Sequence, residues 1–490
     1  MAGTKCKRVF SMGLALAMVG TLTVHAAPST SEGDILLNLE NRPDAPENIP
    51  TNLDIDWNKQ YRFDEIEAYL ESMAEEYPEI TELYSIGRSH QERDLWCLEI
   101  TNEDVPKEDK TGIGVFANIH GGERESAASA LYTAWWTVLC SEDEYVQTLL
   151  DEYILYVIPV INPDGYEQSF VVNTRQNLRP RDLNGDGIPF SDPYTDIDGD
   201  GYIATIYRGT ADDTPSTELE QFGMESCDWD GNGILGDDPR NSGIDMNRNF
   251  NYQWNRFDIE TEDTQVIGNN AWDRAGPDAA SEPEVEALQQ FMYKTPMYAL
   301  ATLHTGIQCV LYPWCYRPYD AENPDDAEIP FMQETAAKMA EAFQEYTGRG
   351  FYTKSSYEDY PTSAELIDYA YGRLNIHAYT IEVYDPGKSE DGDIAACKWE
   401  NTLPEPTWVF YSREEIESKL GLDPDALTDE EGNPLGADEG LWFYTSSTAQ
   451  MADQAPENQD VMVRGCRDAI LTMIGNEPSG NGAQVPYYYK

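Results

Sequence analysis

Apolar and polar positions follow two different rhythms along most of the chain. From Trp57 to Tyr77 apolar side chains recur at the spacing of one helix face, and a second helix is predicted from Ala127 to Leu139. Short apolar runs predict buried strands at Ile113–Ile119, Ile154–Ile161, Tyr298–Leu303 and Ala378–Val383. Helices that alternate with buried strands predict an α/β fold, in which helices cover both faces of a mixed, mostly parallel central sheet.

Two long stretches interrupt this alternation. Residues 182–240 are rich in Asp, Gly and Asn, and residues 386–450 form a second acidic stretch that contains Pro and Gly. Such composition is typical of loops. We therefore predict one domain over residues 57–476 with two acidic loop insertions. A short N-terminal segment at 28–56 precedes it and a tail at 477–490 follows it.

The first 27 residues have the pattern of a secretory signal peptide. Lys5, Lys7 and Arg8 give a basic start, and the apolar run Met12–Val24 leads to small residues that end at Ala27. The apolar run is shorter than the ~20 residues that span a bilayer. We expect cleavage near Ala27, a secreted protein in an extracellular or periplasmic location, and no membrane attachment after cleavage.

The charge balance is strongly acidic. The chain holds 90 Asp and Glu against 32 Lys and Arg, a formal net charge of −58. Removal of the three basic residues in the predicted signal peptide changes −58 to −61. A field of this sign repels nucleic acid and anionic membranes, so the sequence excludes both as partners. Acidity alone describes the environment and does not identify a chemistry.

Histidines and glutamates stand at the ends of predicted strands. His120 and Glu123 follow the run Ile113–Ile119 in His-Gly-Gly-Glu, and His304 ends Tyr298–Leu303. Two residues three positions apart and a distant third ligand can form an open tetrahedral zinc site, although H-x-x-E alone is a weak signal. Glu382 places a carboxylate inside an apolar run, which is costly without a partner. Since ligands gather at the carboxyl ends of strands in such sheets, these residues are predicted to meet.

Several motifs, in order, resemble the zinc carboxypeptidases of the carboxypeptidase A type, and in particular a secreted, bacterial-type member. The similarity runs from Trp57 to about Gly475. Its motifs are Ile86-Gly87-Arg88-Ser89, His120-Gly121-Gly122-Glu123, Asn162-Pro163-Asp164-Gly165, Gly243-Ile244-Asp245-Met246-Asn247-Arg248-Asn249-Phe250, Leu303-His304-Thr305, Leu311-Tyr312-Pro313, Tyr360 upstream of Ile367-Asp368, and Thr380-Ile381-Glu382.

The resemblance implies a secreted exopeptidase that hydrolyses the C-terminal peptide bond of peptides with Zn²⁺. It implies that Glu382 is the general base for a zinc-bound water and that Arg179 polarises the scissile carbonyl, with Arg181 as a rival. The three implied zinc ligands are His120, Glu123 and His304.

The resemblance also implies how a substrate is held. Asn247, Arg248 and Tyr360 resemble the residues that bind the free C-terminal carboxylate, with Tyr357 as a rival for Tyr360. The implied partners are peptide or protein C-termini, and we expect a monomer. The implied pocket for the terminal side chain is lined by Leu311, Cys315, Thr362, Glu365, Ile367 and Thr380.

Two pocket residues set the expected preference. Ile367 occupies the position where an apolar residue accompanies a preference for hydrophobic substrates, and Glu365 introduces a carboxylate that can pair with Lys or Arg. We expect broad release of hydrophobic and basic residues and rejection of acidic ones. The alternative is that Glu365 points to solvent or pairs within the protein.

Three segments of the first insertion repeat the pattern of a calcium loop. Oxygen-bearing residues at positions 1, 3 and 5 with Gly at position 6 allow a sharp turn around a hard cation. The glutamate expected at position 12 is replaced by Pro193, Tyr207 and Pro239. We predict isolated calcium loops, against the alternative of acidic turns without an ion. The candidate ligands are Asp182, Asn184, Asp186, Asp196, Asp198, Asp200, Asp228, Asp230 and Asn232.

Two other functions stay open from the sequence. One is a peptidase of the same fold that acts on peptidoglycan stem peptides, which assays on muropeptides would separate from a general exopeptidase. The other is a calcium-dependent, non-enzymatic binding protein that docks through the acidic insertions. Intact candidate residues for zinc, base and arginine argue against the second alternative.

Overall fold

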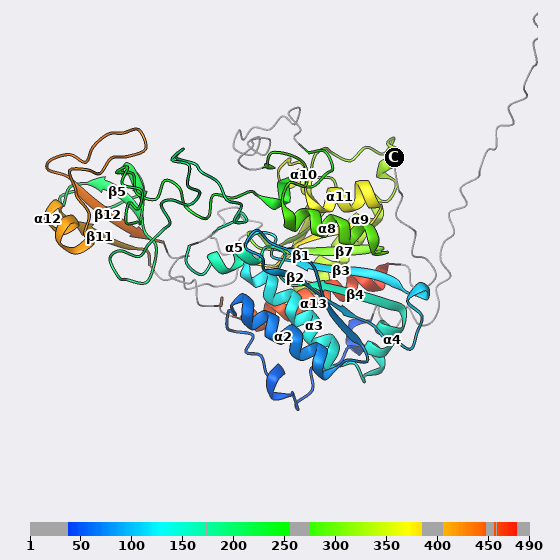
Figure 1. Ribbon diagram of the computed structural model, residues 1–490. Coiled ribbons are helices and arrows are strands. Elements are labelled where there is room, and N and C mark those ends of the chain that lie inside the picture. Colours follow the sequence, from blue (N-terminus) through cyan, green and yellow to red (C-terminus); the bar gives the residue numbers. More distant parts are fainter. Residues whose placement is uncertain are drawn as a thin grey trace, which may run out of the picture.

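The computed structural model describes residues 38–172, 174–254, 275–384, 405–446, 455–456 and 458–477. The predicted signal peptide, part of the second insertion and the end of the tail lie outside these residues. The main sheet has eight strands in the order β1-β2-β4-β3-β7-β10-β8-β9 (Figure 1). Its strands are β1 Thr81–Arg88, β2 Asp94–Ile100, β3 Thr111–Ala117, β4 Tyr153–Ile158, β7 Ala299–His304, β8 Cys309–Tyr312, β9 Tyr352–Ser355 and β10 His377–Glu382.

The centre of this sheet is parallel. β4, β3, β7 and β10 pair in parallel, whereas β1–β2, β2–β4 and β10–β8 are antiparallel. The central strands are fully buried runs, as expected for strands covered on both faces. The parallel register places the carboxyl ends of β3, β7 and β10 at one edge. The mixed, mostly parallel sheet predicted from the sequence is confirmed.

Helices cover both faces of the main sheet. Apolar residues of α2, α3, α9 and α13 pack on one face, and those of α8 and α11 pack on the other. Among the described residues, no helix has the length and apolar composition needed to cross a membrane. The helices are α2 Phe63–Glu76, α3 Arg124–Leu139, α4 Glu144–Glu152, α5 Pro163–Gln168, α8 Pro283–Lys294, α9 Ile329–Thr347, α10 Ser356–Asp359, α11 Leu366–Leu374, α12 Arg413–Glu415 and α13 Gln459–Asn476. Shorter or irregular turns are η1 Leu39–Asn41, η2 Thr51–Leu53, η3 Lys107–Asp109, η4 Met246–Arg248, η6 Pro324–Asp326 and η8 Ile416–Leu420.

The two acidic insertions contain more than loops, because together they build a second sheet. It is antiparallel throughout, in the order β11-β12-β5-β6. The first insertion supplies β5 Thr205–Gly209 and β6 Gln221–Met224, and the second supplies β11 Thr407–Tyr411 and β12 Gly440–Thr445. This insertion sheet stands apart from the main sheet, beyond α5 (Figure 1). It has its own small core, which includes Ile206, Phe222 and Phe443.

Candidate active site

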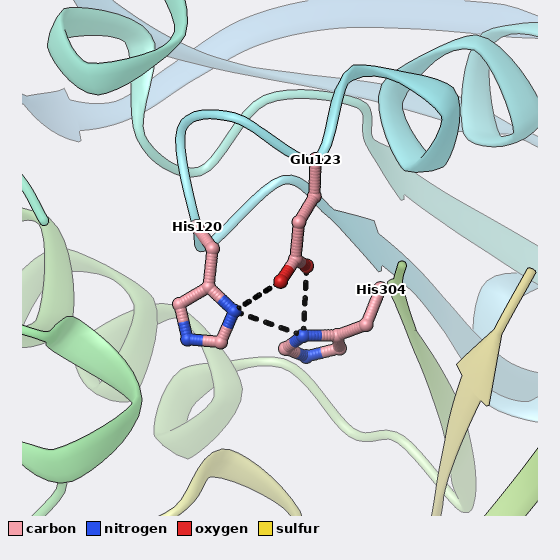
Figure 2. A group of neighbouring side chains, drawn as sticks. All are labelled: His120, Glu123 and His304. Atoms are coloured by element: carbon pink, nitrogen blue, oxygen red, sulfur yellow. Dashed lines mark hydrogen bonds and ion pairs between the residues drawn. The ribbon is translucent and has the colours of Figure 1, made fainter. Parts of the chain in front are cut away.

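Three predicted metal ligands meet at the carboxyl edge of the main sheet (Figure 2). His120 lies in the loop after β3, Glu123 is the cap residue that starts α3, and His304 ends β7. His120 Nδ1 lies 2.7 Å from Glu123 Oε1, and His304 Nδ1 lies 3.0 Å from Glu123 Oε2. The two Nδ1 atoms are 3.2 Å apart. All three side chains therefore turn their ligand atoms toward one point.

The outer nitrogen of each imidazole has its own partner. His120 Nε2 lies 3.2 Å from Asp245 Oδ1, and His304 Nε2 lies 3.3 Å from Thr302 Oγ1. A proton on each Nε2 satisfies these contacts and leaves both Nδ1 lone pairs facing the Glu123 carboxylate. Two imidazole nitrogens and one carboxylate form the three-ligand set of an open zinc site, so the residues fit the metal.

The loop that carries His120 is locked by its own backbone contacts. Asn118 has a φ of 54° and its side-chain amide donates to the carbonyls of His120, Gly121 and Glu123. A Cβ on Gly121 would lie 2.3 Å from the backbone of Gly165. The glycine of the His-Gly-Gly-Glu motif is therefore required by the close approach of the Asn-Pro-Asp-Gly turn.

Glu382 stands beside the three ligands at the end of β10. In the parallel pairing of β7 and β10 it lies opposite His304. Its Oε2 is buried and has no hydrogen-bond partner among the described residues. Burial raises the pKa of Glu382 to about 8, against the opposing charge of His304. A carboxylate that has a raised pKa and lies opposite a residue of the ligand cluster is suited to accept a proton.

The three arginines of this segment have different partners. Arg179, predicted to polarise the scissile carbonyl, donates from Nη1 to Glu282 at 2.8 Å, and its rival Arg181 donates to the carbonyls of Ser242 and Gly243. Arg175, which the sequence did not indicate, is the one that contacts Asp245 and lies near Glu123.

Arg175 reaches the cluster through two acidic residues. Its Nε lies 2.7 Å from Asp245 Oδ2, and its Nη1 lies 3.8 Å from Glu123 Oε1. Its side chain keeps 41% of its surface exposed, so it can still contact a substrate. Sequence spacing could not choose among three arginines within seven residues.

The residues predicted to hold a carboxylate also come together. Asn247 and Arg248 are buried in η4, which Asp245 caps by accepting from Asn247 N at 3.0 Å. Arg248 Nη2 lies 3.3 Å from the hydroxyl of Tyr360, which is 40% exposed. Asp245 contacts both His120 and the η4 turn. It therefore connects the residues predicted to bind the substrate carboxylate with the ligand cluster.

Several residues of the predicted side-chain pocket lie near one another, and Glu365 has partners within the protein. Its Oε1 accepts from Arg248 Nη1 at 2.9 Å and from the hydroxyl of Thr362. Its Oε2 accepts from the Cys315 thiol at 3.4 Å, the one donor to this oxygen within the part of the chain that the structure describes. Ile367 is fully buried nearby in α11. Leu311 and Thr380 are opposite each other in the pairing of β8 and β10.

The first two predicted calcium loops share one hydrogen-bond pattern, and the third departs from it in part. In the second loop Gly199 N and Gly201 N both donate to the Asp196 carboxylate, and Asp200 N donates to Asp198. The first loop repeats these bonds around Asp182. In the third loop Gly233 N donates to the Asp228 carboxylate and Asn232 N to Asp230, but Gly231 N donates to the Asp228 carbonyl.

Carboxylates from outside the loops complete the acidic clusters. Oxygens of Asp196, Asp198 and Glu225 lie within 4.8 Å of one another. Glu225 follows β6, and burial raises its pKa to about 7. Asp237 lies beside the third loop, where it accepts from Asn232 at 2.8 Å. Glu225 and Asp237 do not occupy position 12 of any loop, so the calcium-loop pattern gives no signal for them.

The comparisons with known proteins agree with this geometry. The family model described as zinc carboxypeptidase matches residues 66–403. Zinc carboxypeptidase A 1 of Anopheles gambiae is 25% identical over 345 residues, which cover 69% of this chain and 63% of that protein. Carboxypeptidase B of Astacus astacus is 25% identical over 337 residues, 68% of this chain and 89% of that protein. The chain thus spans less than two thirds of the first of these relatives.

The fold has a solved counterpart. The crystal structure of thrombin activatable fibrinolysis inhibitor superposes with a TM-score of 0.50 at 18% identity, over 72% of this chain and 73% of that one. This likeness concerns the fold alone. Because the family match takes in most of the main sheet together with the His120 loop, His304 and Glu382, the chain belongs to the zinc carboxypeptidase family.

Proposed function

We propose that this protein is a zinc-dependent carboxypeptidase that releases residues one at a time from the C-terminus of peptides. The observation that carries the proposal is the convergence, on one scaffold, of a two-histidine, one-glutamate ligand set, an enclosed carboxylate and a buried arginine. Zinc bound by His120, Glu123 and His304 would supply Lewis-acid chemistry, which polarises a carbonyl and lowers the pKa of water.

The remaining chemistry belongs to the chain's own side chains. Glu382 takes a proton from the attacking water and delivers it to the leaving amine. Arg175 donates hydrogen bonds to the negative charge that develops on the scissile carbonyl oxygen. Asp245 holds both His120 and Arg175 in place. In this arrangement Glu382 is placed to exchange protons with the attacking water and the leaving amine. Arg175 is placed to stabilise the scissile carbonyl oxygen.

Binding of the free C-terminal carboxylate makes the activity exopeptidic. Arg248 Nη2 lies beside the Tyr360 hydroxyl, so the guanidinium and the hydroxyl can donate together to a carboxylate, and Tyr360 can close over it. Asn247 lies beside Arg248 in η4. A peptide whose terminal carboxylate is amidated loses this charge-assisted contact and is expected to be a poor substrate.

The pocket favours hydrophobic and basic terminal residues. Ile367 gives it an apolar floor, and Glu365 Oε2 retains capacity to accept a bond from Lys or Arg because its present donor is only a thiol. Acidic terminal residues would meet Glu365 and are disfavoured.

Further parts of the proposal concern location and metal content. The N-terminal pattern supports secretion with cleavage near Ala27, and the enzyme acts as a monomer. Calcium occupies the Asp-rich loops, where the repeated turn and the added carboxylate of Glu225 supply hard oxygen ligands.

Substitution of the base tests the proposed mechanism. We expect Glu382→Gln to lower kcat by at least about 10²-fold while one zinc per chain is retained, because the side chain moves protons and does not bind metal. Glu123→Gln is the matched control and should lose zinc. Turnover near the wild-type rate in Glu382→Gln would refute the mechanism, as would loss of zinc in that variant.

A further inference from the structure

The insertion sheet has two chemically different faces. Along β12, Leu441 and Phe443 point into the small core, which also contains Ile416 and Leu420 of the η8 turn between β11 and β12. The alternate positions Trp442 and Tyr444 therefore point to the opposite face. None of the side chains on that opposite face belongs to the small core.

Five aromatic side chains gather on the opposite face. The antiparallel register places Trp408 beside Tyr444, and it places Phe410 and Tyr207 on either side of Trp442. Ring centroids are 4.6 Å apart for Trp408 and Tyr444 and 5.0 Å apart for Phe410 and Trp442. All except Tyr207 are partly exposed. We name this group, Tyr207, Trp408, Phe410, Trp442 and Tyr444, the aromatic platform.

The first insertion is connected to the candidate active site through the chain on both sides. Arg175 precedes this insertion, residues 182–240, and Asp245 follows it. The two flanking segments are held together, because Asn177 N donates to Ile244 O at 3.0 Å and Ile244 N donates to Asn177 Oδ1 at 2.9 Å. The second insertion follows Glu382 and Tyr384 in the sequence, and residues 385–404 between Tyr384 and β11 lie outside the described ones. The segment that carries Tyr207 is therefore anchored beside Arg175 and Asp245.

The two segments that build the insertion sheet are acidic in composition. Residues 182–240 hold 15 acidic and two basic side chains, and residues 405–446 hold 11 acidic and two basic ones. Aromatic faces attract Arg and Lys through cation–π contacts, and acidic neighbours add a long-range attraction. Neutral sugars would also stack on aromatic rings, but they gain nothing from this charge. Charge complementarity therefore favours a cationic polypeptide as the occupant.

We propose that the aromatic platform is an exosite that binds a basic, extended segment of a protein substrate while its C-terminus occupies the active site. The inference deepens the proposed function and rests on it, since it names the substrates as proteins with Arg- and Lys-rich segments upstream of the C-terminus. Binding at a second point raises the effective concentration of the C-terminus at the site.

Direct binding tests the exosite apart from catalysis. The probe is a fluorescently labelled oligo-arginine peptide with an amidated C-terminus, and binding is followed by fluorescence anisotropy. We expect Trp408→Thr with Phe410→Thr to weaken binding by about 5-fold or more, as expected for two lost cation–π contacts. Tyr319→Thr is the matched control, because it removes an aromatic side chain that is 49% exposed in the main domain.

The outcomes separate the two proposals. Equal affinity of wild type and double variant, or preference for an oligo-glutamate peptide or a neutral oligosaccharide, overturns the exosite. Because the amidated probe needs no hydrolysis, its binding remains interpretable even if the exopeptidase activity is absent. The single variant Phe410→Thr, on edge strand β11, replaces the double variant if circular dichroism finds the latter unfolded.

Kinetics then connect binding to function. Two peptides share the same C-terminal residues, and only one carries an upstream Arg-rich segment. In the wild type the KM of the basic peptide should be lower, and the ratio of the two KM values should move toward one in Trp408→Thr with Phe410→Thr. A wild-type ratio of one would overturn the exosite.

Discussion

Arg175 and Arg179 are four residues apart and face different partners. Arg175 contacts Asp245 and lies near Glu123, whereas Arg179 is paired with the fully buried Glu282. Glu282 also contacts His90 at 3.0 Å and Asn177 at 2.8 Å. Arg179 therefore shares Glu282 with His90 and Asn177, and we propose that it holds the start of α8 while Arg175 faces the substrate.

Matched substitutions distinguish a catalytic role of Arg175 from a structural role of Arg179. Arg175→Ala should lower kcat/KM by about 10²–10³-fold, because a donor to the developing oxyanion is lost. Arg179→Ala should instead lower the unfolding free energy, because it leaves Glu282 with one partner fewer. Steady-state kinetics and thermal melting on both variants check this. A larger kinetic loss in Arg179→Ala than in Arg175→Ala would restore the original assignment.

Glu365 raises a question that specificity measurements can answer. If Glu365 Oε2, which accepts from the Cys315 thiol, recognises basic side chains, Glu365→Gln should raise KM for peptides that end in Arg or Lys, and KM for those that end in Phe or Leu should change little. If it acts only as the counter-ion of Arg248, KM should change equally for all four. Efficient release of terminal Glu by the wild type would contradict the pocket proposed above.

At the residue scale, the sequence predicts best the site residues that lie at or just after the end of a buried strand. His120, His304 and Glu382 follow or end apolar runs whose parallel pairing brings them together. The sequence does not single out Arg175 as the arginine near the ligand cluster. Arg175 lies in irregular backbone, where no periodicity indicates which side chain points inward. The internal pairing of Glu365 with Arg248 spans 117 residues and has no local signal.

At the scale of elements, the second sheet was not predicted, although its parts were located as insertions. β6 has only four residues, and β11 and β12 are separated by the acidic segment around α12. Such short segments form strands because the two insertions, which are distant in sequence, pair with each other. The eight-stranded sheet was easier to predict because its central strands are continuous apolar runs.

Removal of calcium should loosen the insertion sheet. Asp198 accepts from the Tyr411 hydroxyl at 3.0 Å, and Glu225 accepts from Ala204 N at 2.8 Å, so the second loop contacts the sheet directly. An ion at 100-fold excess over its Kd stabilises the native state by about 2.7 kcal/mol. We expect a calcium-selective chelator to lower Tm by several degrees.

Variants locate this effect. Asp198→Asn should reduce the response of Tm to the chelator, whereas Glu220→Gln, an exposed acid of the same insertion outside the loops, should keep it. An unchanged Tm in the wild type under strong calcium-selective chelation would contradict a structural role for calcium in these loops.

At the scale of the whole molecule, one catalytic scaffold carries a strongly acidic surface and an added sheet. The charge of −58 disfavours acidic substrates at long range, while the insertion sheet and the pocket both offer acidic or aromatic contacts to cations. We expect this chain to differ from relatives without the insertions mainly in substrate preference. We expect the chemistry at the metal to differ less.

The central claim is best tested by mass spectrometry of one peptide in two forms, with a free and with an amidated C-terminus. The account predicts a ladder of products from the free acid, each shorter by one C-terminal residue. The amide should be cut little, and a zinc chelator should abolish the ladder. Equal cleavage of both forms, internal cuts, or a ladder that survives zinc removal would contradict the account.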